Sequence, residues 1–536
     1  MTLTEEIAIA HSQGRRVGWR SWAALVVLML PVLLVSVDNT VLSFALPDIA
    51  RDLSPTSAQQ LWIIDAYPLV LAGLLVTMGV MGDRFGRRRM LLIGATGFAT
   101  ISALAAFAPS AEWLIAARAG MGVFGAMLMP STLSLLRSIF TDREQRRFAI
   151  AVWAAMFSAG AALGPIVGGI LLEHFAWGAV FLMAVPVLLP LLVFAPLLVP
   201  ESRDPHPGRI DPISIALSML TMVPIVFAIK EVAVHGFGVS VPVLVVVGAT
   251  FGALFVRRQL RLETPMLDMR LFSRGTFTGA LLVNLLSVVA LVGFLFFVAQ
   301  HLQLIVGLSP MDAGLALVPG MAAMIVAGLA VVPVAARIDA RVVVPAALAF
   351  SVTGYVLVAL SATDADLALL VAAFVLLGVG IGAAETVSND LILSSTPPAK
   401  AGAASAVSET AYELGAVLGT AVLGGVLTSL FRTGIVLPTG LDGPLALAAR
   451  ETLAGAMTVA DEVGGTVGEQ LRIAAAHAFD SGVVVTSLVG AALVVAAAVI
   501  AAATLRTSPR ADSVSRGTST RKESDVARHQ SGPDPR

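Results

Sequence analysis

Several charged side chains of this 536-residue chain lie inside long apolar stretches. Asp38 lies in VSVDNTVLSFALPDI, directly after the apolar run from Trp22 to Val37, and Arg118 lies in RAGMGVFGAMLMP. A charge at the centre of a bilayer costs about 2.5–3.5 kcal/mol on insertion scales, so such residues are functional by default. The structural alternatives are a hydrogen bond that ties Asp38 to a neighbouring helix and an ion pair that holds Arg118.

A second pair of acids, Glu409 and Glu413, lies in VSETAYELG. Residues four apart share one face of a helix, so at least one of these carboxylates is expected to line a cavity. A buried carboxylate is stable only when its charge is neutralised, and either a proton or an organic cation does this. Competition between the two for one carboxylate would couple proton entry to cation export without ATP.

The composition places these residues in a membrane protein. The chain is 57% hydrophobic and 13% charged, with a mean hydropathy of +0.89, whereas soluble domains carry roughly 25% charged residues. There is no cysteine, and neither the three lysines nor the seven histidines form a P-loop or a metal-ligand spacing. We therefore expect no cofactor, no metal and no nucleic-acid partner.

Apolar segments of about 20 residues are long enough to cross a bilayer as helices. Fourteen such segments are predicted, at 21–46, 59–81, 90–108, 112–136, 148–171, 177–199, 211–232, 240–256, 276–300, 311–334, 341–361, 366–393, 402–428 and 481–504. The first run is roughly 25 residues long, which favours a membrane span over a cleaved signal peptide.

Basic residues are concentrated in alternate connections, which predicts the orientation. If the N-terminus is cytoplasmic, most arginines fall on its side, and the opposite side holds only Arg51, Lys230, Arg432, Arg450 and Arg472. Both termini are then cytoplasmic and the number of spans is even. The predicted organisation is a cytoplasmic segment at 1–20, a six-helix bundle at 21–199, two extra helices with linkers at 200–275, a second six-helix bundle at 276–506 and a disordered cytoplasmic tail at 507–536. The second bundle includes an outer connection at 429–480, whose alanine-rich stretches are expected to form short helices at or above the outer surface.

Two glycine-containing motifs accompany the charged residues. The connection GVMGDRFGRRR has the spacing G-x-x-x-D-R-x-G-R-R, in which ion pairs could link neighbouring helices; the plain alternative is an ordinary basic loop. Its residues are Gly79, Asp83, Arg84, Gly86, Arg87 and Arg88. The string SAGAALGPIVGG repeats glycine every four residues, giving a smooth face for close helix packing, and its proline permits a bend. Its residues are Gly160, Gly164, Pro165, Gly168 and Gly169.

These motifs resemble those of the major facilitator superfamily. The basic connection is similar to the loop between helices 2 and 3, a cytoplasmic latch in that family, and the segment 328–341 repeats it weakly in the second half. The glycine string resembles the antiporter motif of drug exporters. VDNTVLSFALPDI with Asp38, LWIIDAYPLVLAG with Asp65, and VSETAYELG resemble the fourteen-helix drug:proton antiporters, nearest to those that export quaternary ammonium compounds and cationic dyes.

The resemblance implies an all-α integral membrane protein with two six-helix bundles and two additional central helices. It implies that Asp38, Asp65, Glu409, Glu413 and Arg118 serve proton coupling or cation recognition. The expected protein is a monomeric multidrug antiporter of the bacterial inner membrane that exchanges protons for lipophilic cations such as ethidium, with fluoroquinolones as a further candidate class. The alternative within transport is a dedicated exporter of a metabolite or antibiotic made by its host.

One departure from the resemblance concerns an acid that some members carry in helix 10. Here LVPGMAAMIVAGL has no carboxylate. Glu385 and Asp390 in the next apolar segment but one are possible substitutes, but five residues place them ~140° apart around a helix. They cannot both face one cavity, so divalent-cation transport is not assumed.

Overall fold

The computed structural model describes residues 18–204, 211–262, 265, 267, 269–361, 366–396 and 401–505. Residues 1–17 of the predicted N-terminal segment and the predicted tail at 507–536 lie outside this description. Throughout the described ranges the regular structure is helical. Every predicted apolar segment is helical, although 177–199 is divided into two helices and 402–428 contains a π-helical turn.

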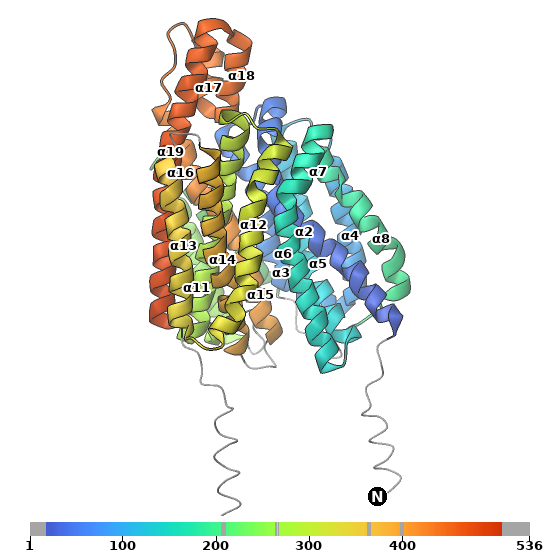
Figure 1. The fold of residues 1–536 in the computed structure, drawn as a ribbon. Helices are drawn as coiled ribbons and strands as arrows, with labels where there is room; N and C mark the ends of the chain where they lie inside the picture. Colours follow the sequence, from blue (N-terminus) through green and yellow to red (C-terminus); the bar gives the residue numbers. More distant parts are fainter. Residues whose placement is uncertain are drawn as a thin grey trace, which may run out of the picture.

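The first half of the chain forms one bundle, coloured blue to teal in Figure 1. Polar residues begin several of its helices: Thr56 and Gln59 form a reciprocal capping box, and the Asp142 carboxylate accepts two backbone N–H groups, which satisfies donors that have no partner within the helix. The helices are α2 (Trp19–Leu53), α3 (Ser57–Phe85), α4 (Arg87–Ala105), α5 (Ala111–Ile139), α6 (Arg143–His174), α7 (Ala179–Leu182) and α8 (Ala184–Leu198).

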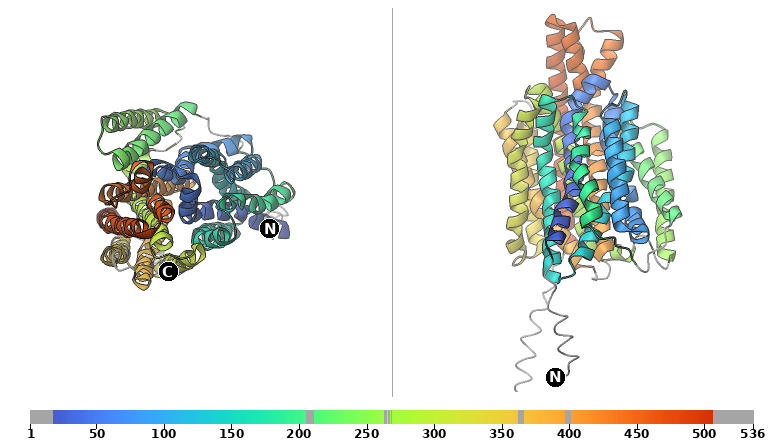
Figure 2. Two further views of the ribbon diagram at one scale, coloured as in Figure 1. Left: turned by 90° about the horizontal axis from the view of Figure 1, so that it is seen from above. Right: turned by 90° about the vertical axis from the view of Figure 1, so that its right-hand side faces the viewer.

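A hairpin of two further helices, α9 (Pro212–His235) and α10 (Ser240–Arg261), follows. Asp211 caps α9 and also accepts two 2.8 Å hydrogen bonds from the Arg258 guanidinium, which ties the two helices together. Those hydrogen bonds lower the pKa of Asp211 from 3.8 to about 2. The hairpin lies at the edge of the molecule (Figure 2) and α9 packs on α3 and α16.

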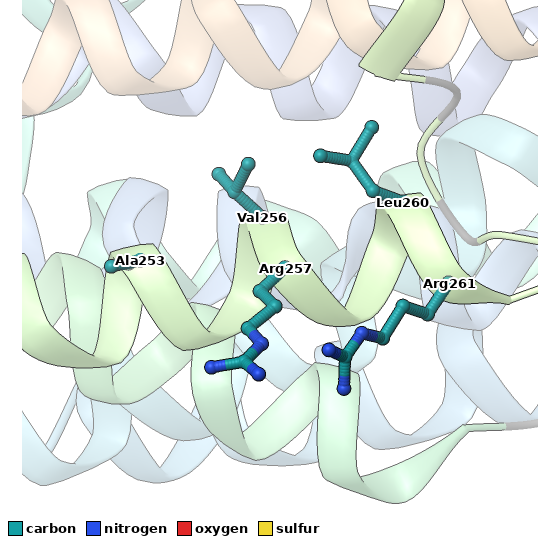
Figure 3. Close-up of a pocket in the computed structure, with 6 residues that line it drawn as sticks. Ala253, Val256, Arg257, Leu260 and Arg261 are labelled. Carbon is teal, nitrogen blue, oxygen red and sulfur yellow. The ribbon is translucent and has the colours of Figure 1, made fainter.

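The end of α10 carries a shallow outward pocket. Val256 and Leu260 point to one side of it, and the side chains of Arg257 and Arg261 extend together to the other (Figure 3). Apolar and basic side chains side by side are typical of a helix end at the membrane surface.

The second half forms the other bundle, coloured yellow to red in Figure 1. After a short 3₁₀ helix η1 (Met269–Ser273), its elements are α11 (Gly275–Gln300), the π-helix η2 (His301–Ile305), α12 (Pro310–Ala335), α13 (Ala340–Ser361), α14 (Leu367–Ser394), α15 (Ala401–Leu418), the π-helix η4 (Gly419–Gly424), α16 (Gly425–Gly434), α17 (Gly443–Glu451), α18 (Leu453–Val463) and α19 (Gly465–Thr504).

The part of this bundle that contains the predicted connection at 429–480 differs from the expectation. Short helices α17 and α18 do occur in the predicted connection, but α19 begins at Gly465 rather than at residue 481. Its 40 residues correspond to about 60 Å of helix, which is twice the ~30 Å hydrocarbon layer. The first half of α19 therefore projects with α17 and α18 beyond the rest of the molecule (Figure 1).

Among the described residues, twelve helices are long and apolar enough to cross a membrane, and the two parts of α6, bent by 43° relative to each other, add a thirteenth if they form one span. The remaining predicted span coincides with α4, which has three arginines in its first turn. Fourteen spans are compatible with this structure, and the passage of α4 through the bilayer stays a prediction.

The molecule has two distinct ends. One end, which we call the arginine face, carries the turn between α3 and α4, the start of α2 and the end of α19 (Figure 1). The opposite end, which we call the cap face, carries α17 and α18. The two bundles meet where α6 packs on α12, α3 on α15 and α2 on α11. Near the cap face, Glu451 of α17 accepts hydrogen bonds from the backbone and side chain of Ser57 at the start of α3.

Candidate functional site

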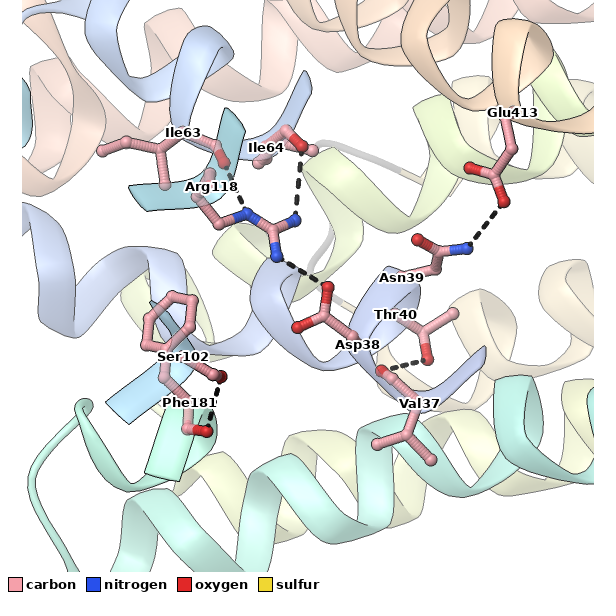
Figure 4. Close-up of polar contacts among 10 residues, drawn as sticks. All are labelled: Val37, Asp38, Asn39, Thr40, Ile63, Ile64, Ser102, Arg118, Phe181 and Glu413. Carbon is pink, nitrogen blue, oxygen red and sulfur yellow. Dashed lines mark hydrogen bonds and ion pairs between the residues drawn. The ribbon is translucent and has the colours of Figure 1, made fainter. Parts of the chain in front are cut away.

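Asp38 and Arg118 form an ion pair in the middle of the first bundle. The Arg118 Nη1 atom lies 2.6 Å from Asp38 Oδ2, and the two side chains are 2% and 4% exposed. Nε and Nη2 of Arg118 donate to the carbonyl oxygens of Ile63 and Ile64 in α3, at 3.1 and 3.5 Å (Figure 4). The guanidinium also lies 4.7 Å from the centre of the Tyr67 ring. The predicted acid of α2 and the predicted cation of α5 therefore neutralise each other.

The backbone of α3 explains one of these contacts. Pro68 has no N–H group, so the carbonyl of Ile64, four residues earlier, has no donor within the helix. Arg118 supplies a donor to that oxygen. The arginine thus serves both a carboxylate and a backbone position that the proline leaves open.

Glu413 approaches the same region from the second bundle. Its side chain is buried, and Asn39, the neighbour of Asp38, donates from Nδ2 to Glu413 Oε1 at 3.4 Å. Figure 4 shows Asn39 between the two carboxylates. The other oxygen, Oε2, is buried without a hydrogen-bond partner among the described residues. Unlike Asp38, Glu413 has a neutral amide as its only described hydrogen-bond partner.

Aromatic rings stand beside Glu413. Tyr412 of α15 makes an edge contact with Phe157 of α6, with ring centres 5.4 Å apart, and Phe157 is stacked with Trp153 at 6.3 Å. All three rings are half-buried. Aromatic faces attract cations, so this wall between the two bundles suits a lipophilic cation held near a carboxylate.

The glycine string of α6 lets this helix approach α2 closely at the level of Asp38. A Cβ atom at Gly160 would lie 2.7 Å from the Ser36 Cβ, one at Gly168 would lie 2.9 Å from the Val41 Cγ2, and one at Gly164 would overlap the Thr40 hydroxyl. The Thr40 hydroxyl donates to the Ala161 carbonyl at 3.1 Å, the oxygen that Pro165 leaves without a backbone donor. The motif therefore fixes α6 against the segment that carries Asp38 and Asn39.

The same motif also contacts the second bundle. A Cβ atom at Gly169 would lie 2.7 Å from the Met311 Cα, and one at Gly314 would overlap the Pro165 carbonyl. Met311 and Gly314 lie at the start of α12. The helix α6 therefore contacts both α2 and the second bundle through positions where a side chain would not fit.

Asp65 lies in a different pair. Its carboxylate is fully buried and lies 2.8 Å from Nζ of Lys230 in α9. The prediction that Lys230 belongs to an outer connection is wrong, because this lysine is 3% exposed and lies within a helix. The predicted span at 211–232 already contained this position, so the basic residue should have been counted within the span and not with the connections.

The predicted latch makes contacts within the first bundle. Asp83 pairs with Arg87 at 2.8 Å, and Arg88 donates to the carbonyl oxygens of Pro196 and Val199 at the end of α8. Arg84 is exposed. Gly86 has φ +115°, a conformation that favours glycine, and a Cβ atom there would contact the Glu201 carboxylate. The motif joins the turn between α3 and α4 to the end of α8.

The remaining acids are less constrained. Glu409 is half-buried one turn before Glu413. In α14, Asp390 is exposed, whereas Glu385 has a buried oxygen without a described hydrogen-bond partner, so the two face different environments as their spacing predicted. Within the described ranges, no three His, Asp or Glu side chains are placed to hold a metal ion.

Several residues of this region were missed by the sequence reasoning. Asn39, Tyr67 and the ring pair of Phe157 and Tyr412 are neither ionised nor part of a glycine motif. The signal available was the position in the chain: Asn39 is next to Asp38, Tyr67 is next to Pro68 and Tyr412 is next to Glu413. A polar or aromatic residue beside a functional one often shares its environment.

A sequence profile of the Major Facilitator Superfamily matches residues 28–420. The chain is 56% identical over 472 residues to a protein described as multidrug efflux pump LfrA of Mycolicibacterium smegmatis, which covers 88% of this chain and 94% of that protein. It is 36% identical over 467 residues to the methyl viologen resistance protein SmvA of Salmonella typhimurium, with 86% and 93% covered.

Among the solved structures with a similar fold is a bacterial homologue of the human lysosomal transporter Spinster in an inward-facing and unoccupied conformation. The TM-score is 0.66 at 19% identity, over 92% of this chain and 100% of that chain. At this identity the likeness concerns the fold alone.

Proposed function

Because the chain belongs to the major facilitator superfamily, whose members are membrane transporters rather than enzymes, we propose that it exports lipophilic organic cations in exchange for protons. It is a multi-pass transporter of the bacterial membrane, and we place the arginine face in the cytoplasm by the positive-inside rule. The relatives described as a multidrug efflux pump and as a methyl viologen resistance protein support export of such compounds.

The observation that carries the proposal is the environment of Glu413. This carboxylate is buried between the two bundles, has a neutral amide as its described hydrogen-bond partner and leaves Oε2 without one. A buried carboxylate in that position is stable only when a proton or a cation neutralises it. The half-buried rings of Tyr412, Phe157 and Trp153 provide an apolar, cation-attracting wall beside it.

The exchange then follows from alternating access. With the site open to the cytoplasm, a lipophilic cation binds against the rings and displaces the proton from Glu413. With the site open to the outside, the cation leaves and a proton from the medium returns to the carboxylate. Since one carboxylate serves both ligands, the inward proton gradient drives export and no ATP is needed.

Asp38 and Arg118 have a different part in this scheme. Asp38 is already neutralised by a fixed cation at 2.6 Å, and its neighbour Asn39 contacts Glu413. We propose that protonation of Glu413 is sensed through Asn39 by the α2 segment that holds the Asp38–Arg118 pair. Glu409, one turn away, is proposed as the carboxylate nearer the arginine face that cations meet first.

The test is efflux of ethidium from whole cells, energised and then treated with a protonophore. Wild type is compared with Glu413→Gln and Asp38→Asn, and the matched control is Asp390→Asn, which removes an exposed acid. We expect wild type and the control to export ethidium until the protonophore is added, and both test variants to lose export. Fluoroquinolones are then tested as a second substrate class.

Two results would change the conclusion. If well-expressed wild type exports neither dyes nor quaternary ammonium compounds, a dedicated exporter of a host-made metabolite becomes the better account. If both test variants export as well as wild type, the protein remains an exporter and these acids have structural roles.

A further inference from the structure

The outward face of α10 carries two arginines that have no counter-ion in the described part of the chain. Arg257 and Arg261 are both exposed, lie one helical turn apart and extend together from the helix (Figure 3). The adjacent Arg258 is different, because its guanidinium donates two 2.8 Å hydrogen bonds to Asp211. Like charges four residues apart on a helix repel each other, so an anion between the two free guanidinium groups would be stabilising.

Other cations of the arginine face are already engaged within the chain. Five arginines of this face have a carboxylate or a backbone carbonyl as partner: Arg87, Arg88, Arg89, Arg274 and Arg341. The two arginines of α10 are therefore available to an anion that does not belong to the protein.

An apolar hollow continues from these arginines toward the middle of α10. Gly252 and Ala253 have almost no side chain, and Val256 and Leu260 form the rest of its apolar lining. The helix rises about 13 Å between residues 252 and 261, which is close to half of the ~30 Å hydrocarbon layer. The hollow is thus charged at one end and apolar over the depth that one acyl chain occupies.

The surroundings of α10 are lipid rather than protein. Among the described spans α10 is the least enclosed, with 11% of its apolar segment buried against 78% in α2. It packs on α9 and touches η1, and outward residues such as Val243 are more than half exposed. A ligand that lies along this face therefore comes from the bilayer.

We propose that Arg257 and Arg261 bind the phosphate of an anionic phospholipid, whose acyl chain lies in the hollow over Gly252 and Ala253. Guanidinium groups match the oxygens of a phosphate with paired N–H donors, and basic pockets beside membrane helices bind anionic headgroups. A zwitterionic phospholipid also has a phosphate, but its ammonium group would be repelled by two arginines. The inference is independent of which compound the protein exports.

The test uses the absence of cysteine from the chain. A bimane fluorophore is attached to Ala253→Cys, inside the hollow, and the full chain is reconstituted in phosphatidylcholine. Brominated phosphatidylglycerol or brominated phosphatidylcholine is then added in increasing fractions, because bromine quenches a fluorophore that it contacts. The control label is placed at Val243→Cys, which is exposed near the other end of the same helix.

The proposal predicts a preference for the anionic lipid at position 253 alone. Half-maximal quenching there should need about tenfold less brominated phosphatidylglycerol than brominated phosphatidylcholine, since each arginine near an anionic headgroup contributes severalfold. The label at position 243 should be quenched by both lipids at similar fractions. Equal quenching by the two lipids at position 253 would overturn the proposal without any arginine variant.

Arginine variants separate a site from the general charge of the arginine face. Arg257→Gln combined with Arg261→Gln should abolish the preference at position 253. The matched control combines Arg203→Gln with Arg337→Gln, which removes the same charge from two exposed arginines elsewhere and should keep the preference. A preference that survives the first pair of substitutions, or is lost equally with the second, would overturn the proposal.

Two other occupants of this face give different results. Inorganic phosphate, added at constant ionic strength, should leave the preference unchanged because it has no chain to fill the hollow; loss of the preference would identify a soluble anion as the ligand and overturn the proposal. If the labelled protein elutes as a dimer and neither brominated lipid quenches position 253, the face is a contact between two copies, and the proposal is likewise overturned.

Discussion

Replacing Gly164 by alanine should separate α6 from α2 at the level of the site. The new Cβ atom would overlap the Thr40 hydroxyl and lie 2.9 Å from the Thr40 Cβ and 3.2 Å from the Val37 carbonyl oxygen. Carbon atoms in contact are normally about 3.5–4.0 Å apart. The helices must therefore move apart by several tenths of an ångström, or Thr40 must turn away.

Both responses have a cost that can be estimated. Overpacking of this kind costs about 1–3 kcal/mol. If Thr40 turns, the Ala161 carbonyl loses its hydrogen bond at 3.1 Å, and a buried acceptor left alone costs about 1–3 kcal/mol. Whichever response occurs, we expect a loss of about 1–3 kcal/mol in the free energy of unfolding, with reduced efflux because α2 carries Asp38 and Asn39.

The assay is thermal unfolding of detergent-purified protein together with ethidium efflux. The matched control is Gly79→Ala, because a Cβ atom there would lie 3.5 Å from the Pro130 Cβ, an ordinary contact. Adding Thr40→Ala to Gly164→Ala should recover part of the stability by making room. If Gly164→Ala is as stable as Gly79→Ala, close packing at this motif is not what the glycine provides.

Three further predictions concern charged groups. Arg118→Met should destabilise the protein by about 3–5 kcal/mol because Asp38 stays buried without its partner. Adding Asp38→Asn to this variant should recover most of the thermal stability. Equal melting temperatures of the single and the double variant would contradict this. Arg88→Ala should cost about 1 kcal/mol through its two carbonyl contacts at a partly exposed site, whereas Arg84→Ala, at an exposed position, should leave the melting temperature unchanged. The pKa of Asp211 is lowered to about 2, so the stability from its hydrogen bonds to Arg258 is fully present above pH 3.8 and is lost only as the pH falls toward 2. Asp211→Asn should therefore lower the melting temperature equally at pH 5 and pH 8, and a difference that vanishes at pH 5 would refute the assignment.

The fold was predictable because hydropathy determines it. Apart from a closed β-barrel, the helix is the structure whose backbone hydrogen bonds are all made inside a bilayer. Each apolar segment of about 20 residues was therefore expected to form a helix. The extension of α19 back to Gly465 was not foreseen, because the projecting turns lie outside the bilayer, where alanine-rich sequence is compatible with a separate short helix as well.

The charged residues of the candidate site could be picked out from the sequence, but the partners of these residues could not. Asp38, Arg118 and Glu413 stand out against apolar neighbours, but nothing in the spacing says that Arg118 reaches Asp38 while Glu413 meets an amide. Partner choice depends on how helices rotate and approach, and these quantities follow from packing between residues far apart in the chain.

The central claim is that a cation replaces a proton on Glu413, and proton release on substrate binding measures this directly. Purified protein in weakly buffered detergent is mixed with tetraphenylphosphonium while a pH indicator is followed, and Glu413→Gln and Asp390→Asn are run in parallel. The account predicts proton release from wild type and from Asp390→Asn, and none from Glu413→Gln. Equal release from Glu413→Gln, or binding to wild type without any release, would contradict it.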